Sequence, residues 1–174
     1  MKKIAITILL STLVAQPAVA DLYTGIKVGR VAYGYPGNSQ QVGYGLLYGN
    51  TITKNFSVEG EFNNLGEYAS ATDNVTGTAY SFSAAGFHPI KPLFSLFGKV
   101  GLFRSTLSAK AKPGSGQTGS QSISNRGLMV GFGAQFKISK EISVRAGVDI
   151  YPPWGGVQKT SAVRMVYLSS VLKF

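Results

Sequence analysis

Few residues of this 174-residue chain could do catalytic or metal chemistry. It has one histidine, His88, and no cysteine. We find no Ser-His-acid arrangement around His88, and with a single His and no Cys a zinc site is not indicated. We expect His88 to be a turn residue, and we predict no catalytic residue, no metal site and no cofactor.

Charge pairing is the other chemistry that the sequence offers. In otherwise apolar segments, charged residues recur at alternate positions: Lys27, Glu59, Glu61, Lys99, Arg145 and Asp149, with Gln135 in an equivalent position. If the fold encloses them together, the charges should pair, because an isolated charge in a low-dielectric interior is very costly. We expect Glu59 to pair with Arg145, Lys27 or Lys99.

The elements that would position these charges are β-strands. Apolar residues alternate with glycine, polar or charged residues, and a period of two predicts a strand whose two faces meet different surroundings. The segments that show this alternation are eight in number: 22–28, 42–48, 56–62, 80–86, 96–102, 128–136, 144–150 and 166–174.

The connections between these segments are unequal in length. Four are polar or rich in Gly and Pro, namely 34–40, 65–77, 105–125 and 152–161, and they alternate with tight turns at 51–55, 88–92 and 139–141. An even number of strands with short turns at one end and long loops at the other is typical of outer-membrane barrels with both termini in the periplasm.

The composition indicates which face meets which medium. The chain is 44% hydrophobic and only 14% charged, and its mean hydropathy is +0.12. A soluble barrel would carry a charged coat, whereas the non-apolar face here consists largely of Gly and Ser. We predict an all-β, eight-stranded, antiparallel, up-and-down transmembrane β-barrel. A soluble periplasmic lipocalin-like binding barrel is the alternative.

The N-terminus predicts export. Lys2 and Lys3 precede an apolar run over 4–14, and Ala18 and Ala20 form a small-residue cleavage motif. This order is typical of a cleavable signal peptide, and the apolar run is too short for a membrane-spanning helix. We assign 1–20 to the signal peptide and 21–174 to a barrel in the bacterial outer membrane.

Particular residues carry a family resemblance across 21–174. They are the first strand 23–29, Glu59 on the third strand, the turn 138–142 followed by Arg145, and Phe174 with Leu172, Leu168 and Val166 at alternate positions before it. In these features the chain resembles the eight-stranded outer-membrane barrels of the OmpA type, including the neisserial surface and opacity proteins. The resemblance implies that Val166, Leu168, Leu172 and Phe174 form the signal read by the outer-membrane assembly machinery after passage through periplasmic chaperones.

The resemblance also implies a function without catalysis. We expect a monomer that supports envelope integrity and presents surface loops for adhesion or host-factor binding. A narrow ion channel is the alternative, because such barrels use a lumenal acid and base in gating. Ala85 and Gln135 depart from that pattern, which favours a fixed network that fills the lumen. A lipid-modifying enzyme would need an outward nucleophile and base that we do not find.

The excess of basic residues predicts an anionic partner at the outer rim. The chain has a net charge of +10, and basic residues flank the third and fourth long loops: Arg104, Lys110, Lys112, Arg126 and Lys159. These could contact lipopolysaccharide phosphates, whereas their scattered arrangement argues against nucleic acid. Aromatic residues near strand ends are expected to form interfacial girdles, namely Tyr23, Tyr33, Tyr44, Tyr48, Tyr80, Tyr151 and Trp154.

Overall fold

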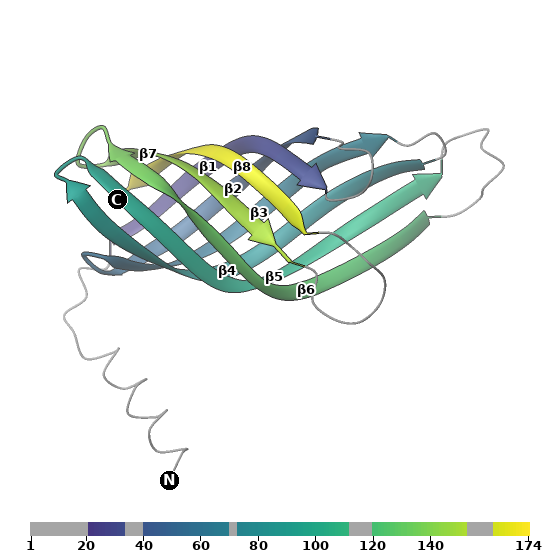
Figure 1. Ribbon diagram of the computed structural model, residues 1–174, viewed down its shortest axis with the longest axis horizontal. Helices are drawn as coiled ribbons and strands as arrows, with labels where there is room; N and C mark the ends of the chain where they lie inside the picture. Colours follow the sequence, from purple (N-terminus) through teal and green to yellow (C-terminus); the bar gives the residue numbers. More distant parts are fainter. Residues whose placement is uncertain (1–20, 34–39, 70–72, 112–119, 153–161) are drawn as a thin grey trace, which may run out of the picture.

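The computed structural model describes residues 21–33, 40–69, 73–111, 120–152 and 162–174, and it is a closed barrel (Figure 1). Each strand pairs antiparallel with the next, and the last pairs with the first. The strands are β1 (Asp21–Tyr33), β2 (Gln40–Thr53), β3 (Phe56–Ala69), β4 (Asp73–Lys91), β5 (Phe94–Ala111), β6 (Ser120–Lys137), β7 (Ile142–Tyr151) and β8 (Val163–Lys173). The predicted fold class and strand number are confirmed.

The period of two separates the two faces of every strand. In β8, Met165, Tyr167 and Ser169 are buried, whereas Val166 and Leu168 between them are exposed. The outer face is therefore an apolar belt, as expected of a barrel surrounded by lipid. On β5 and β6 the apolar outward positions span 94–102 and 128–136, about the nine to eleven residues that a strand needs to cross a bilayer.

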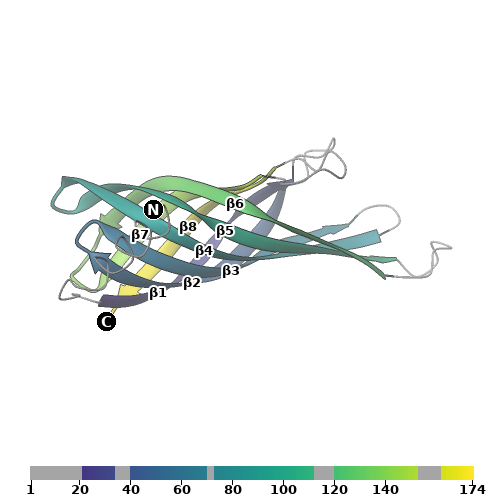
Figure 2. The ribbon, with the colours of Figure 1, turned by 90° about the horizontal axis from the view of Figure 1, so that it is seen from below.

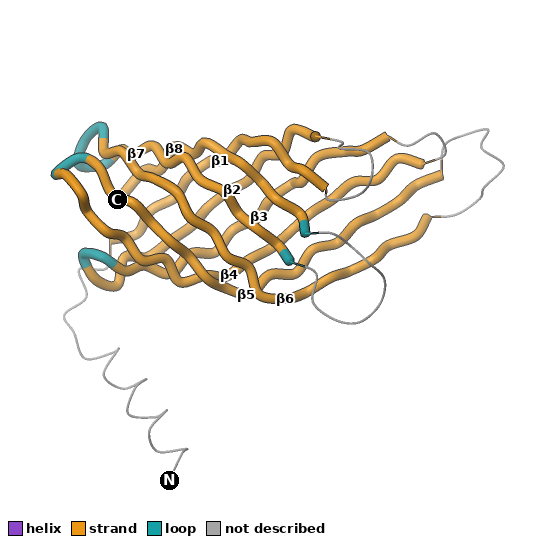
Figure 3. The backbone as a smooth tube through the Cα atoms, in the orientation of Figure 1, coloured by secondary structure: helices purple, strands orange, loops and turns teal. Residues whose placement is uncertain are grey.

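Both described chain ends and the short turns lie at one end of the barrel, here called the turn end. Figure 3 shows the turns at 54–55, 92–93 and 138–141 beside the C-terminus. The Phe174 N–H donates to the Leu22 carbonyl oxygen at 2.9 Å. In outer-membrane barrels the short turns face the periplasm, so the opposite end is the outer end. Within the described ranges, no helix has the length and apolarity that crossing a membrane requires.

The strands at the outer end are longer than the sequence predicted. Segments 65–77 and 105–125 were expected as loops, but β3 to β6 continue into them and project at the end opposite the turns (Figure 2). We define the outer extension as residues 67–69, 73–78, 106–111 and 120–124. Small hydroxyl side chains face each other across it, as in Thr106 and Ser124, whose Oγ atoms lie 3.2 Å apart. The hydroxyl residues lie on the outward face, where the belt is apolar, and Leu107 and Ile123 lie on the other face. Alternation therefore continues with the opposite sense, and the polar, loop-like composition concealed it.

His88 is a second correction, because it lies in a strand and not in a turn. It faces outward on β4 opposite Leu96, and Pro89 follows it opposite Ser95. The register shifts between Pro89 and Lys91, which fits a proline that cannot donate to the ladder. The turn itself begins only at residue 92.

A β-bulge marks where the outer extension leaves the barrel. The β2–β3 pairing ends at Tyr44 and Asn64, and the β3–β4 register shifts between Asn64 and Glu67. Gly66 has a φ of 85°, a conformation that favours glycine. The Asn64 Oδ1 accepts the Gly66 N–H at 2.9 Å. Among the described strands, β3 pairs beyond this bulge with β4 alone.

Candidate functional site

The interior of the barrel collects the charges that the sequence singled out. All six, together with Gln135, are buried and point inward from β1, β3, β5, β6 and β7: Lys27, Glu59, Glu61, Lys99, Arg145 and Asp149. They divide into two groups along the barrel axis, a cluster of four and an arginine-centred group.

The cluster of four consists of Lys27, Lys99, Glu61 and Asp149. The Lys27 Nζ lies 2.6 Å from the Glu61 Oε2 and 2.6 Å from the Asp149 Oδ2. The Lys99 Nζ contacts both acids as well, at 2.9 Å from the Asp149 Oδ1. Each base thus shares both acids, and the cluster is electrically neutral. Such mutual pairing is what offsets the cost of removing four charges from water.

An aromatic ring and a glycine shape the space around this cluster. The Tyr167 ring centroid lies 4.0 Å from the Lys27 Nζ and 5.5 Å from the Lys99 Nζ, within the range of cation–π attraction. On β6, a Cβ at Gly131 would stand 2.5 Å from the Asp149 Oδ1 and 2.6 Å from the Lys99 Cε. Glycine at this position therefore leaves the room that the charges occupy.

The arginine-centred group lies nearer the turn end. The Arg145 Nη1 donates to the Glu59 Oε1 at 2.6 Å, and its Nε donates to the Gln135 Oε1 at 2.7 Å. The Tyr23 hydroxyl donates to the same Glu59 oxygen at 2.6 Å and lies 2.8 Å from the Ser57 Oγ. Of the three partners expected for Glu59, the structure selects Arg145, whereas the lysines bind the other two acids.

An apolar layer lies between the charges and the outer end. It takes one inward residue from each of seven strands: Val31, Leu65, Ala79, Phe103, Met129, Tyr151 and Met165. Each is at most 4% exposed. An eight-stranded barrel is narrow enough for side chains to fill it. Here the charged residues fill the middle of the lumen, and this apolar layer fills it on their outer side.

These contacts favour a structural role for the lumenal charges over a catalytic one. The carboxylates and bases are engaged with one another and enclosed on the outer side by the apolar layer. Within the described part of the chain, no three His, Asp or Glu side chains gather as metal ligands would.

Several lumenal residues were missed or misplaced by sequence reasoning. Tyr23 and Tyr151, expected in the girdles, face inward, and Tyr33 is half-buried and donates to the Leu65 carbonyl oxygen at 2.9 Å. Asn63 Nδ2 donates to Glu61 and to the Tyr151 hydroxyl, both at 3.2 Å. The outward tyrosines are Tyr44, Tyr48 and Tyr80, while Trp154 lies outside the described residues. Odd numbering, shared with the buried charges on the same strands, was the signal that could have found the inward ones.

The predicted outer basic residues are only partly placed. Arg104 on β5 and Arg126 on β6 are exposed and stand directly opposite each other. Lys110 lies within β5, one residue before its end at Ala111, and Lys112 and Lys159 fall outside the described residues. The residues of the expected assembly signal are exposed along the outer face of β8, which runs toward the turn end, or just after it: Val166, Leu168, Leu172 and Phe174.

Comparison with solved structures agrees with this architecture. The attachment invasion locus protein Ail of Yersinia pestis matches with a TM-score of 0.60 at 21% identity, over 91% of this chain and 100% of that chain. Ail in complex with the heparin analogue sucrose octasulfate gives 0.61 at 21%, over 89% and 97%. Neisserial surface protein A gives 0.70 at 12%, over 88% and 96%. At these identities the likeness shows the fold.

The sequence itself matches a family model. No curated protein matches the chain significantly, but the model described as "Outer membrane protein beta-barrel domain" matches residues 5–160. The expected resemblance is thereby confirmed, and the alternative of a soluble periplasmic barrel is wrong. The chain belongs to the outer membrane β-barrel family, and its place is the bacterial outer membrane.

Proposed function

We propose that this chain is a non-catalytic barrel that supports envelope integrity and presents its outer end for adhesion or host-factor binding. The observation that carries the proposal is the outer extension, in which β3 to β6 continue beyond the apolar belt with a polar outward face. A barrel that served only to fill the membrane would need no such projection. Rigid scaffolds that carry exposed segments of this kind are where binding functions concentrate.

The outer extension offers hydrogen-bonding groups to a partner. Hydroxyl pairs such as Thr106 with Ser124 and Ser108 with Ser122 line it. Among the described strands, β7 pairs with β6 only from Val130 onward, so 120–129 pair with β5 alone. The other edge of that segment carries backbone N–H and C=O groups to which an extended partner segment could add.

The contacts inside the lumen favour the proposed role over ion conduction. Lysine and acid side chains in the lumen are mutually paired, and the apolar layer separates them from the outer end. These contacts argue for a fixed filling of the lumen and against the narrow-channel alternative. Among the residues that the structure describes, no nucleophile with a neighbouring base supports a lipid-modifying enzyme.

Biogenesis completes the proposal. Residues 1–20 lie outside the described residues, and we assign them to a signal peptide that is removed during export. Periplasmic chaperones and the assembly machinery would then insert the barrel through its C-terminal signal, which ends at Phe174. Sequencing the N-terminus of the protein purified from outer membranes should read from Asp21, and a start at Met1 would contradict this assignment.

The binding role is tested by shortening the outer extension. Ser105 and Asn125 are directly opposite, so an Asn-Gly turn can replace 106–124 and close the β5–β6 hairpin. Cells displaying either form are compared for attachment to host cells and to immobilised heparin, the latter because Ail was solved with a heparin analogue. The shortened form should lose most of the attachment.

A control keeps this result interpretable. An unboiled sample of each form should run faster on a gel than a boiled one, because a closed barrel resists detergent, and the amounts at the cell surface should be equal. If the shortened form is folded and equally abundant but attaches as well as the full chain, the outer extension does not carry the function.

A further inference from the structure

Two arginines stand face to face on the outer surface. Arg104 of β5 and Arg126 of β6 are register partners, and both side chains are exposed. Directly opposed residues of an antiparallel pair have Cβ atoms about 5 Å apart on the same face of the sheet, and like charges in this position are destabilising. The two guanidinium groups therefore favour a shared anion.

The described part of the protein supplies no such anion. Neither arginine forms an ion pair with any described acid. Three acids are buried in the lumen, and Asp21 and Glu141 lie at the turn end. Asp73 begins β4 opposite Ala111, seven residues along the strand from Tyr80. Glu67 is on the outer face but stands opposite Thr76, two outward positions beyond Tyr80 on β4. The arrangement is the reverse of that in the lumen, where each lysine has two acids.

The arginine pair lies where the outer face changes from apolar to polar. One row across β4, β5 and β6 consists of Tyr80, Arg104 and Arg126. The next row toward the turn end is Phe82, Leu102 and Leu128, and the next row outward is Thr78, Thr106 and Ser124. This is the level at which interfacial tyrosines and lipid headgroups are found in outer-membrane barrels.

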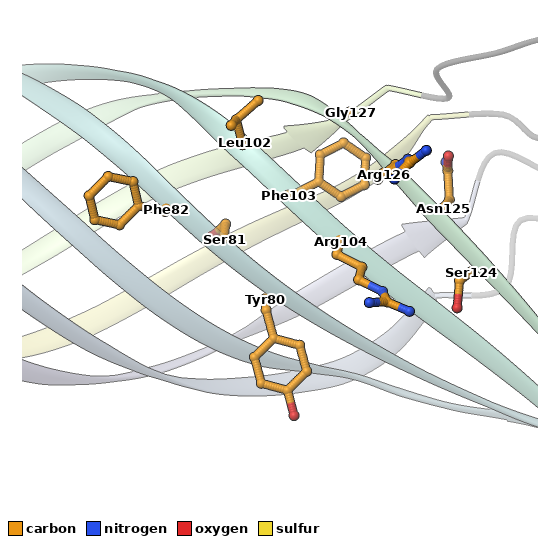
Figure 4. A pocket seen from close by; sticks show the side chains of 10 residues that line it. All are labelled: Tyr80, Ser81, Phe82, Leu102, Phe103, Arg104, Ser124, Asn125, Arg126 and Gly127. Carbon is orange, nitrogen blue, oxygen red and sulfur yellow. The ribbon is translucent and has the colours of Figure 1, made fainter.

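A groove of about 1040 Å³ follows this boundary (Figure 4). Its lining combines the two arginines with Tyr80, Phe82 and Leu102. A ligand that fits it must carry a negative group at one end and apolar chains at the other. Among envelope components, a phosphorylated lipid has this chemistry.

We propose that Arg104 and Arg126 bind the phosphate of an outer-leaflet glycolipid whose acyl chains lie along Phe82 and Leu102. Guanidinium groups can each donate two parallel hydrogen bonds to phosphate oxygens, and the ligand charge relieves the repulsion between the arginines. The site concerns how the barrel is held among its lipids, so it stands apart from the adhesive role of the outer extension.

The test measures lipid binding by the refolded full-length barrel. The protein is placed in phosphatidylcholine vesicles with either diphosphorylated lipid A or the same lipid without its phosphates, and the bound lipid is quantified by mass spectrometry. The variants are Arg104→Gln with Arg126→Gln, each single change, and Arg104→Lys with Arg126→Lys. The matched control removes two exposed charges near the turn end, Lys137→Gln with Lys140→Gln.

Wild type should prefer the phosphorylated lipid, and the double glutamine variant should bind it about 25-fold more weakly, from about fivefold for each arginine. The lysine variant should fall between them, because it keeps charge but loses paired hydrogen bonds. The turn-end control should change binding less than twofold.

Three outcomes would overturn the proposal. One is equal binding of the two lipids by wild type, and another is an equal loss in the turn-end control. The third is full competition by heparin, with no dependence on the acyl chains, which would make the groove a polyanion site instead of a lipid site. The faster gel mobility of unboiled protein confirms that each variant is folded. If the double variant does not fold, the two single variants test the proposal.

Discussion

The barrel brings like charges together in two regions, the lumen and the outer face. Within the part of the chain that the structure describes, it supplies counter-ions to the charges in the first region and none to those in the second. In the lumen, Lys27 and Lys99 approach the same two acids and are neutralised by them. On the outer face, Arg104 and Arg126 oppose each other, and the described residues place no acid against them. The same strand alternation produces both regions.

The difference follows from the surroundings. An unpaired charge in the enclosed lumen would cost several kcal/mol, so the fold must contain its own counter-ions there. At the headgroup boundary, water and lipid phosphates are available, so an exposed charge needs no counter-ion from the protein. We infer that the paired charges hold the barrel together and that the unpaired ones point to its ligands.

The largest expected effect comes from breaking the lumenal balance. Glu61→Leu removes one acid from two buried lysines and should lower the free energy of unfolding by about 3–5 kcal/mol. Glu67→Leu makes the same change at an exposed position of the same strand and should stay within about 0.5 kcal/mol of wild type. Urea unfolding in vesicles, followed by circular dichroism, measures both. Equal effects would mean that the buried cluster is not structural.

The arginine-centred group should respond less strongly. Tyr23→Phe removes a hydroxyl that donates to Glu59, and a hydrogen bond to a charged group is worth about 1.5–3 kcal/mol. Tyr48→Phe, on the lipid-facing side, should leave the free energy of unfolding unchanged. A matching loss in Tyr48→Phe would show that the measurement reports tyrosine content and not the lumenal contact.

The room left by glycine gives a third prediction. Gly131→Val places side-chain atoms among Lys99 and Asp149 and should destabilise the barrel by about 1–3 kcal/mol. Gly86→Val faces outward, where no atom lies within 4 Å of its Cβ, so it should be neutral or slightly stabilising in the same unfolding experiment. If both changes are tolerated, the charges do not occupy that space.

The smallest effect should have the opposite sign. In vesicles without phosphorylated glycolipid, replacing Arg104 and Arg126 by Gln removes a like-charge contact and should raise the free energy of unfolding by about 0.2–1 kcal/mol. Addition of lipid A should then stabilise wild type more than the variant. A destabilised variant in lipid without phosphate would show that the arginines have a protein partner after all.

Much of this architecture could be predicted from alternation, because parity alone decides whether a side chain faces lipid or lumen. Parity placed Lys27, Glu61 and Asp149 on the inward side, and the structure buries all three. Tyr23 and Tyr151 were misplaced because the usual preference of tyrosine for interfaces was given more weight than their odd numbering. The outer extension was missed for a different reason: its outward positions carry Thr and Ser, whereas Leu107 and Ile123 lie on the other face. The alternation there has the opposite sense to that of the belt, and the polar composition suggested loops.

The sequence alone could not predict which acid pairs with which base. Glu59 and Glu61 both point inward from β3, one pleat apart, and the bases come from β1, β5 and β7. Which acid meets which base depends on the stagger of the strands around the closed barrel. The opposition of Arg104 and Arg126 likewise depends on the β5–β6 register, which is set by the whole length of that hairpin.

The central claim is that the lumen is filled by its own side chains, so that the barrel acts through its outer surface. Recording current across a planar bilayer that contains the purified protein tests this most directly. We predict no discrete current steps from wild type, because the apolar layer and the paired charges close the lumen. Steady steps whose ion selectivity changes in Glu61→Gln would contradict the claim and establish a channel.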